Sequence, residues 1–490
     1  MVSRFLSGFF SLFIIFQSGC ISKPELNMEE LQINIPKEWS IPMHSDNAAA
    51  GEWWVAFNNK ELNKFLSLIK TESPDFLSLI QNQKIGLYNS KVIGASILPS
   101  LNLGFNRSES VQNLSAFGFA DDFLNPRGSD TLAQSQNSDN NVMKFDNTTY
   151  GLGLNLQWEL DVWGRLLNER EAAKKDYKAL TYDLSYIGFS LLVRSAILYF
   201  QAVEAMAQLD LSKGSYESLV EIRDLVKNRY GKGLRSSLDY RLSETSVSTA
   251  IIEMENRKNQ LVAINRQLQL LTGEYPSGHF IKENKLPKYL PPIPLSIPAA
   301  IIDRRPDIRS LILKIESNSH RIAQAKRNLL PGIMLTGSMG TSTPDLEEIL
   351  NEDFGVWNLG LGVTSPIFNG QRLRSAIKIQ EASFEKSKQD LKKGLLQAFS
   401  EIEQYMYYDQ SLIVQMNALE SAVEQSRDAY NLSKERYDKG VTTLESVLNS
   451  QRQYNSIQSQ YLFLQRQSIE NRLSLILAMG GDLNFTIKNN

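Results

Sequence analysis

Residues 151–160 have the sequence GLGLNLQWEL, in which apolar side chains alternate with glycine and polar side chains. A period of two predicts a β-strand, because successive side chains point to opposite faces of a sheet. Residues 357–364, WNLGLGVT, alternate in the same way. Alternation over about 10 residues is typical of a membrane-spanning barrel strand, with one face toward lipid. The predicted lipid-facing residues are Leu152, Leu154, Leu156, Trp158, Trp357, Leu359, Leu361 and Val363.

Two shorter alternating runs, Leu101–Phe105 and Ile333–Leu335, predict a partner for each of these strands. A strand in a soluble sandwich shows the same pattern, but the rest of the sequence is predominantly helical and offers no second sheet as a cover. Lipid would then cover the apolar faces. Unpaired strand edges cost several kcal/mol per group in hydrocarbon, and about 8 strands form the smallest barrel. Four strands cannot close alone, so we expect three copies to form a barrel of twelve strands.

The strand pairs belong to a sequence that occurs twice in the chain. The matched positions are Pro74 with Pro306 and Pro99 with Pro331, 232 residues apart, then Gly164 with Gly370 and Arg229 with Arg436, 206 and 207 residues apart. The separation is smaller for the later matches because the first half contains extra residues in the stretch Ser108–Asn147. This stretch is rich in Asn, Ser, Asp and Gly, which predicts a solvated loop. Four ordered matches indicate an internal tandem duplication.

The remaining sequence predicts unusually long helices. No proline occurs between Arg165 and Arg229, and apolar residues recur there mostly at steps of three and four, as in a coiled coil. Such a helix would span roughly 96 Å at 1.5 Å per residue, unless Gly214 interrupts it. Return helices are expected after the turns at Tyr230–Gly233 and Asp438–Gly440. We therefore expect a mixed α+β membrane protein, with four strands of a trimeric twelve-stranded barrel and a long coiled-coil helical barrel.

The N-terminus predicts export from the cytoplasm. Arg4 precedes the apolar run Phe5–Phe16, which is too short for a membrane-spanning helix of about 20 residues and is typical of a cleaved signal peptide. Cys20, the only cysteine, comes directly after Ser18 and Gly19 at the end of this signal, so an intrachain disulfide is excluded. The position resembles the bacterial lipobox, which implies a lipid on Cys20, and Ile21 after it implies sorting to the outer membrane. The alternative is an incidental thiol in a discarded peptide, because Gln17 occupies a position that is usually aliphatic in the lipobox.

Composition and motifs argue against several other classes. The formal net charge is −2 with no basic stretch, so nucleic acid is not an expected partner. His44, His279 and His320 lack the spacing of metal ligands, and we expect neither a metal nor another cofactor. Phosphate-binding GxxxxGK[ST], HExxH and GxSxG motifs do not occur, so an enzyme is not expected.

Three further stretches carry a resemblance to a known family. They are Glu52, Trp53, Trp54 and Phe57, the DRRPDIR motif at Asp303–Arg309 and the paired RYxxG turns at Arg229 and Arg436. With them, nearly the whole chain resembles the TolC-like outer-membrane efflux factors, in particular the lipoprotein branch of the NodT type. The resemblance implies a homotrimer that is anchored by lipid in the bacterial outer membrane and extends into the periplasm. It would be the outer-membrane channel of a tripartite efflux system, with a periplasmic adaptor protein and an inner-membrane transporter of the RND type as partners.

Two alternatives to this function remain. One is the outer-membrane duct of a type I protein secretion system, and the other is a periplasmic adaptor protein. An adaptor could also have a lipidated start and a helical hairpin, but it should lack the four alternating strands and the duplication. The cargo and the pump cannot be read from the sequence.

The resemblance also implies where the duct is gated. The helix-tip turns that would contact the adaptor are Arg229, Tyr230, Gly233, Arg436 and Gly440, and the resting constriction would be lined by Tyr437, Glu445, Asn449 and Arg452. Family members usually carry an Asp-x-x-Arg pair just beyond the second turn, where this sequence has Asn449 and Arg452. An ion pair that contains a carboxylate weakens on acidification, whereas an Asn–Arg hydrogen bond does not titrate near neutrality.

These observations divide the chain into six expected parts. Residues 1–19 form the lipoprotein signal peptide, and residues 20–72 the lipidated N-terminal segment with the start of an equatorial region. The first structural repeat is 73–280, a proline-rich linker is 281–302, the second repeat is 303–482 and a C-terminal tail is 483–490. Each repeat is expected to contain a helix, a strand, a loop, a strand, a long helix and a return helix.

Overall fold

A computed structural model describes residues 23–31, 33, 35–41, 53–113, 144–288, 290 and 298–480. The signal peptide with Cys20, Glu52, residues 289 and 291–297 of the proline-rich linker and the tail 483–490 lie outside the described residues.

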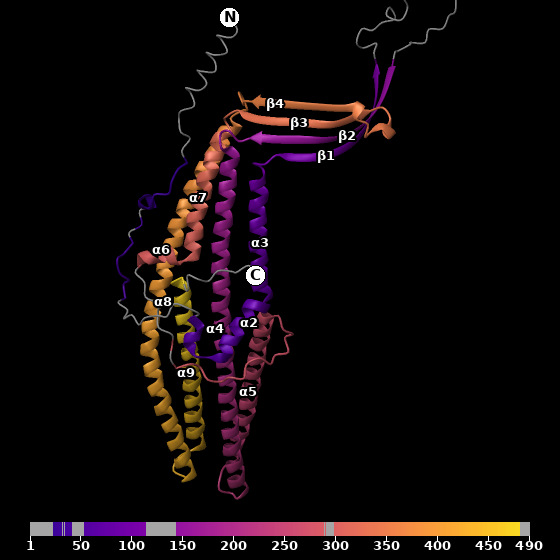
Figure 1. Ribbon diagram of the computed structural model, residues 1–490. Helices are drawn as coiled ribbons and strands as arrows, with labels where there is room; N and C mark the ends of the chain where they lie inside the picture. Colours follow the sequence, from indigo (N-terminus) through magenta and orange to yellow (C-terminus); the bar gives the residue numbers. More distant parts are fainter. Residues whose placement is uncertain are drawn as a thin grey trace, which may run out of the picture. The chain divides into compact units, whose positions relative to one another are not determined.

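The described strands form one antiparallel sheet in the order β1-β2-β3-β4 (Figure 1). Their bounds are Ser100–Asn113 for β1, Lys144–Leu160 for β2, Gly332–Thr343 for β3 and Gly355–Thr364 for β4. Leu103 lies opposite Leu154, Leu154 opposite Met339, and Met339 opposite Trp357. Paired residues share a face, so the apolar side chains of all four strands lie on one face, as the alternation predicts.

The opposite face of the sheet is polar and nearly uncharged. One row of paired residues across it consists of Asn102, Asn155, Ser338 and Asn358. On the described strands, Glu159 is the only charged residue of this face, and Arg165 binds its carboxylate at 2.7 and 3.0 Å. This face therefore offers hydroxyl and amide groups without net charge.

The prediction of a solvated loop over Ser108–Asn147 is wrong at both ends, because β1 and β2 extend into it. The apolar alternation stops where Arg107 lies opposite Tyr150, with the guanidinium 5.9 Å from the ring centroid. Beyond this pair the strands keep their backbone hydrogen bonds while their side chains become polar. Apolar–polar alternation indicates which residues contact an apolar environment, and it does not predict strand pairing that continues into water.

The helices include two of exceptional length. The α-helices are α2 (Lys60–Glu72), α3 (Pro74–Ala95), α4 (Arg165–Gly231), α5 (Ser237–Thr272), α6 (Ile301–Arg304), α7 (Pro306–Arg327), α8 (Arg372–Asp438) and α9 (Leu444–Ala478). Short 3₁₀ helices are η1 (Met28–Leu31), η2 (Trp53–Phe57), η5 (Pro298–Ala300), η6 (Leu346–Glu348) and η7 (Glu352–Phe354). Both α4 and α8 contain 67 residues, and α4 continues through Gly214 without a break. Both halves of the chain thus follow the order helix, two strands, long helix and return helix.

One described helix, α4, contains an 18-residue stretch that is apolar enough to cross a membrane. Of this stretch, 61% is buried inside the protein. Its side chains, including Leu192, Val193 and Ala196, belong to a core cluster with α2 and α9. Packing against other helices therefore accounts for the apolar character of α4.

The chain forms two compact units that each draw on both halves of the sequence. The first unit contains the sheet and comprises Lys91–Ala173 and Ser319–Ala382 with the described end of Met1–Pro24. The second unit comprises Glu25–Ser90, Lys174–Asn318 and Ser383–Asn490. The repeats are thus units of sequence and of element order, and they do not pack as two separate domains.

Two motifs named in the sequence have structural roles in the second unit. Trp53, Trp54 and Phe57 pack on α4, where the Phe57 ring lies 5.2 Å from that of Phe200. In DRRPDIR, the Arg305 side chain is 3% exposed and donates to Asp307 at 2.8 and 3.1 Å. The same guanidinium donates to Glu401 on α8 at 3.0 Å and to a carbonyl oxygen at the end of α9 at 3.1 Å. Arg305 therefore joins the start of α7 to two other helices.

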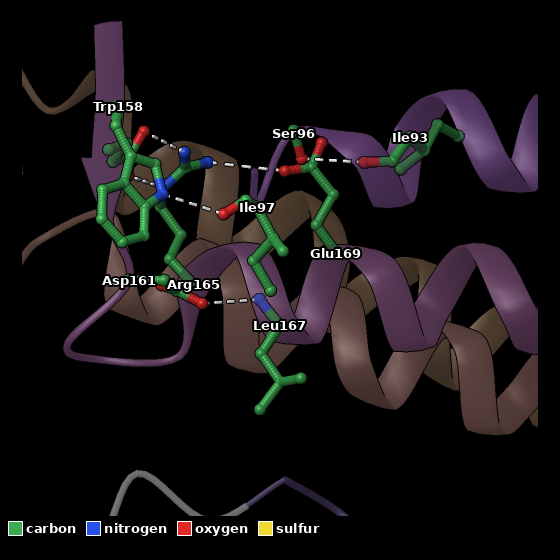
Figure 2. A network of polar contacts seen from close by, with 9 residues as sticks. Ile93, Ser96, Ile97, Trp158, Asp161, Arg165, Leu167 and Glu169 are labelled. Carbon is green, nitrogen blue, oxygen red and sulfur yellow. Dashed lines mark hydrogen bonds and ion pairs between the residues drawn. The ribbon is translucent and has the colours of Figure 1, made fainter. Parts of the chain in front are cut away.

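In the first unit, a polar network joins β2 to α4 (Figure 2). The Asp161 carboxylate accepts from the backbone N–H of Leu167 at 2.7 Å and so caps α4. Arg165 reaches Glu159 at 2.7 Å and Glu169 at 3.5 Å, and the Trp158 ring nitrogen donates to the carbonyl oxygen of Ile97 at 3.0 Å. The chain therefore passes from strand to helix through a turn whose polar groups are paired.

We predict that Arg305→Ala lowers the free energy of unfolding by about 1–3 kcal/mol, the usual range for hydrogen bonds to a charged group. The loss should fall toward the lower end, because Asp307 and Glu401 are partly exposed and regain water. Thermal unfolding of the purified protein measures it. Arg304→Ala is the matched control, and an equal effect of both substitutions would contradict the role of Arg305.

We predict that Gly340→Ala disrupts the sheet. An added Cβ would lie 2.1 Å from the Leu152 carbonyl oxygen and 2.5 Å from Gly153 Cα, and both atoms belong to backbone that cannot move aside freely. Overpacking of this kind typically costs about 1–3 kcal/mol. The midpoint of urea unfolding followed by circular dichroism reports it. Gly362→Ala, whose nearest neighbour would be 3.9 Å away, should be tolerated, and equal stability of both variants would refute the prediction.

Candidate functional site at the helix tips

Both helix-to-helix turns have the same backbone geometry. Residues 229–234, RYGKGL, end α4, and residues 436–441, RYDKGV, end α8. The N–H of Gly233 donates to the carbonyl of Tyr230 at 2.9 Å, and that of Leu234 to Arg229 at 2.9 Å. This pair of bonds is a Schellman motif, and it places Gly233 at a φ of +71°. The second turn repeats it with Gly440 at +76°, so the RYxxG spacing is a helix stop.

The return helices begin with matching caps. The hydroxyl of Ser236 accepts from the N–H of Asp239 at 3.1 Å, and the hydroxyl of Thr443 accepts from the N–H of Ser446 at 3.3 Å. Ser and Thr are favoured at this position because they satisfy an amide that has no partner within the helix. Each turn is therefore fixed on both sides by local sequence.

Tyr437 occupies the centre of the contact between the two turns. Its side chain is 2% exposed and packs with Val226, Leu444 and Val447. Among the described residues, its hydroxyl has no hydrogen-bond partner. Burial raises the pKa of this hydroxyl, although the charge of Arg235 lowers it in part, so the phenol remains neutral near neutral pH. Tyr437 therefore fills the apolar contact between the α4–α5 and α8–α9 helical hairpins.

Two arginines of the first turn reach across to the second. The guanidinium of Arg229 donates to the carbonyl oxygen of Asp438 at 3.4 Å and lies 3.6 Å from its carboxylate. Arg235 donates to the carbonyl oxygen of Tyr437 at 3.5 Å and lies 4.4 Å from the centroid of its ring. Cations are favourable at the C-terminal end of α8, where carbonyl oxygens lack helical partners. We call Arg229, Arg235, Tyr437 and Asp438 the tip latch.

Sequence reasoning missed Arg235. A signal for it exists in the repeat, because the matching position 207 residues later is Thr442 rather than a cation. A difference between two otherwise equivalent turns would have identified Arg235 as a residue with a role in only one of them.

The residues predicted to line the gate fall into two groups. Glu445, Asn449 and Arg452 are exposed on the first turns of α9, and their spacing of four and three places them on one face. Arg452 donates to the Asn449 side-chain oxygen, so these two are brought together. Tyr437 lies apart from this face because it is buried in the tip latch.

Within the part of the chain that the structure describes, no group of three or more His, Cys, Asp and Glu side chains could hold a metal ion. His279 and His320 are described and lie in different units, while His44 lies outside the described residues.

The comparisons with known proteins agree with this architecture. Residues 65–274 and 297–481 match the model of the outer membrane efflux protein family. The chain is 25% identical over 463 residues to a pyoverdine export outer membrane protein of Pseudomonas putida, covering 91% of this chain and 92% of the relative. It is 25% identical over 429 residues to a toluene efflux pump outer membrane protein of the same species, covering 88% and 85%.

A solved structure shares the fold. The CmeC outer membrane channel of Campylobacter jejuni superimposes with a TM-score of 0.81 at 20% identity, covering 96% of each chain. The four-stranded sheet with long helices is therefore the TolC-like outer-membrane channel fold, as the sequence predicted. The chain belongs to the outer membrane efflux protein family.

Proposed function

We propose that three copies of this chain form the outer-membrane channel of a tripartite efflux system, which carries substrates from an inner-membrane pump and a periplasmic adaptor to the exterior. The observation that carries the proposal is the sheet with its apolar, exposed face and its polar, nearly uncharged face. Lipid is the environment that suits the first face, and a water-filled lumen suits the second.

The trimer is supported by the edges of the sheet. β1 and β4 are its outer strands, and within the described residues each has a strand neighbour on one side only. Backbone groups cannot remain unpaired in hydrocarbon, so β4 of one copy must pair with β1 of the next. A head-to-tail contact of this kind closes into a ring. Three copies give twelve strands, which is above the minimum of about eight.

The cargo is proposed to be selected upstream of this chain. The relatives are named for pyoverdine export and for toluene efflux, which are different substrates. The inner face of the sheet carries no unpaired charge among the described residues and so discriminates little by charge. Specificity is then a property of the pump and adaptor.

A lipid on Cys20 is part of the proposal, and the lipoprotein branch of the family rests on it. The described N-terminal segment is held along α8 in the second unit. Glu30 pairs with Lys388 at 2.8 Å, the rings of Trp39 and Phe399 lie 6.2 Å apart, and Ser40 donates twice to Glu403 at 3.0 Å. A segment fixed in this way can link α8 to a membrane anchor at its start.

We predict that Cys20→Ser abolishes labelling by radioactive palmitate and reduces the fraction of protein in the outer membrane. Several acyl chains hold a protein firmly, and removing the acceptor thiol removes them all. Palmitate labelling and membrane fractionation measure the two effects. Retained labelling would show that Cys20 is not the lipidation site. Ser18→Ala, two residues earlier, serves as the control that keeps the thiol.

The tip latch is proposed to hold the periplasmic end closed, with Glu445, Asn449 and Arg452 at the constriction. We predict that Arg235→Ala raises the resting single-channel conductance severalfold, because it frees the first hairpin from the carbonyl of Tyr437. Lys232→Ala removes a cation from the same turn that has no partner among the described residues, and it should leave the conductance unchanged. Equal conductance of Arg235→Ala and the unchanged protein would contradict the latch.

Arg452→Ala tests the constriction itself. It removes the donor to Asn449, and we expect the closed-state conductance to rise. The rise should be the same at pH 6 and pH 8, because the contact between Arg452 and Asn449 involves no carboxylate. An unchanged closed-state conductance would show that Arg452 does not gate, and a rise that depends on pH would implicate a carboxylate such as Glu445.

A further inference from the structure

Large apolar side chains are exposed at every connection between the sheet and the helices of the first unit. They are Leu98 before β1, Val162 after β2, Leu329 before β3, and Ile367 and Phe368 after β4. The antiparallel register places all four connections at the same end of the sheet. Ile367 and Phe368 are 97% and 90% exposed. Burial of such apolar side chains is favourable, so this pair indicates a surface that something covers.

The connection between β4 and α8 differs from its counterpart between β2 and α4. At the positions of Ile367 and Phe368 the first repeat has Asp161 and Val162. Asp161 caps α4, and Figure 2 shows its carboxylate at the N–H of Leu167. The second repeat has no carboxylate there, and its chain turns into α8 through Gly370 and Gln371 at φ values of +59° and +66°. A non-glycine residue in this region is strained, and strain of this kind is often retained at functional sites.

Two arginines follow directly, in a position that the helix itself disfavours. Arg372 and Arg374 lie exposed in the first turn of α8, which contains no acidic residue. The positive end of the helix dipole repels cations. Among the described residues, neither guanidinium has an ion-pair partner. An anion from outside the chain would satisfy both, and guanidinium groups bind phosphate with two parallel hydrogen bonds.

We propose that the β4–α8 connection is a lipid-binding site. Ile367 and Phe368 enter the acyl-chain region of the periplasmic leaflet, and Arg372 and Arg374 bind the phosphate of an anionic glycerophospholipid. The proposal rests on the proposed function, which places the apolar face of the sheet in the outer membrane.

Charge favours a lipid over a second copy of the chain as the occupant. The acidic residues at this end of the sheet are already engaged. Glu159 binds Arg165, Asp161 caps α4, and Glu381 pairs with Lys378 at 2.8 Å. These three carboxylates of a second copy would therefore not be free for Arg372 and Arg374, whereas an anionic lipid supplies both an apolar and an anionic partner.

Spin labelling tests the site in the assembled protein. A nitroxide on Phe368→Cys, in vesicles of phosphatidylethanolamine and phosphatidylglycerol, should be accessible to oxygen and inaccessible to a water-soluble nickel chelate. Leu359→Cys, on the lipid-facing strand, is the control for lipid contact, and Tyr275→Cys in an exposed loop is the control for water. The parent protein controls for labelling at Cys20, its only cysteine.

The outcomes separate this proposal from the proposed function. Access of the nickel chelate to position 368 would place it in water, and exclusion of both reagents would place it against protein. Either result overturns the lipid site if position 359 behaves as lipid-exposed. If position 359 is itself closed to oxygen, the membrane placement of the whole sheet fails.

A second experiment tests the role of Arg372 and Arg374. Arg372→Gln with Arg374→Gln should lower the oxygen access of position 368 in vesicles with phosphatidylglycerol and leave it unchanged in pure phosphatidylcholine. Lys378→Gln, whose cation is paired with Glu381, is the matched control and should have no effect. Equal loss in both lipids would refute an anionic headgroup at the arginines, as would no loss in either.

Discussion

The pairing of backbone hydrogen bonds in the sheet is the constraint on which the rest of this structure depends. A sheet whose apolar face meets hydrocarbon cannot leave a strand edge open, because no water is present to bond the free N–H and C=O groups. The described part of the chain supplies four strands in sequence order, and this sheet has two open edges. In the proposed channel, closure comes from further copies of the same chain, and the duct, its bore and its symmetry follow from that requirement.

The duplication meets the constraint economically, and the differences between the repeats mark the specialised positions. Both halves use the same strand pair, the same Schellman turn and the same capped return helix. At three matched positions the two repeats carry residues of different kinds. The pairs, first repeat before second, are Ser73 and Arg305, Arg235 and Thr442, and Asp161 and Ile367. Arg305 joins α7 to two other helices, Arg235 contacts the second helix-tip turn, and Ile367 is an exposed apolar residue in the β4–α8 connection. Residues that match between the repeats build the shared scaffold, and residues that differ between them have distinct roles.

Local patterns in the sequence were sufficient for much of the fold. Alternation at Leu152–Leu160 predicted the face on which each side chain lies, and the RYxxG spacing predicted the turns, because both depend on backbone geometry a few residues long. The outer parts of β1 and β2 were missed, since strand pairing in water leaves no apolar pattern. The burial of Tyr437 under Arg235 could not be predicted, because it depends on contact between residues about 200 positions apart. The residues assigned to the gate remain predictions for the same reason.

Native mass spectrometry of the protein extracted from the outer membrane tests the central claim most directly. If open sheet edges force closure, folded protein should be released as a species of three chains, and no folded monomer should accompany it. A stable monomer that retains its sheet, or a closed assembly of another number of chains, would contradict the account.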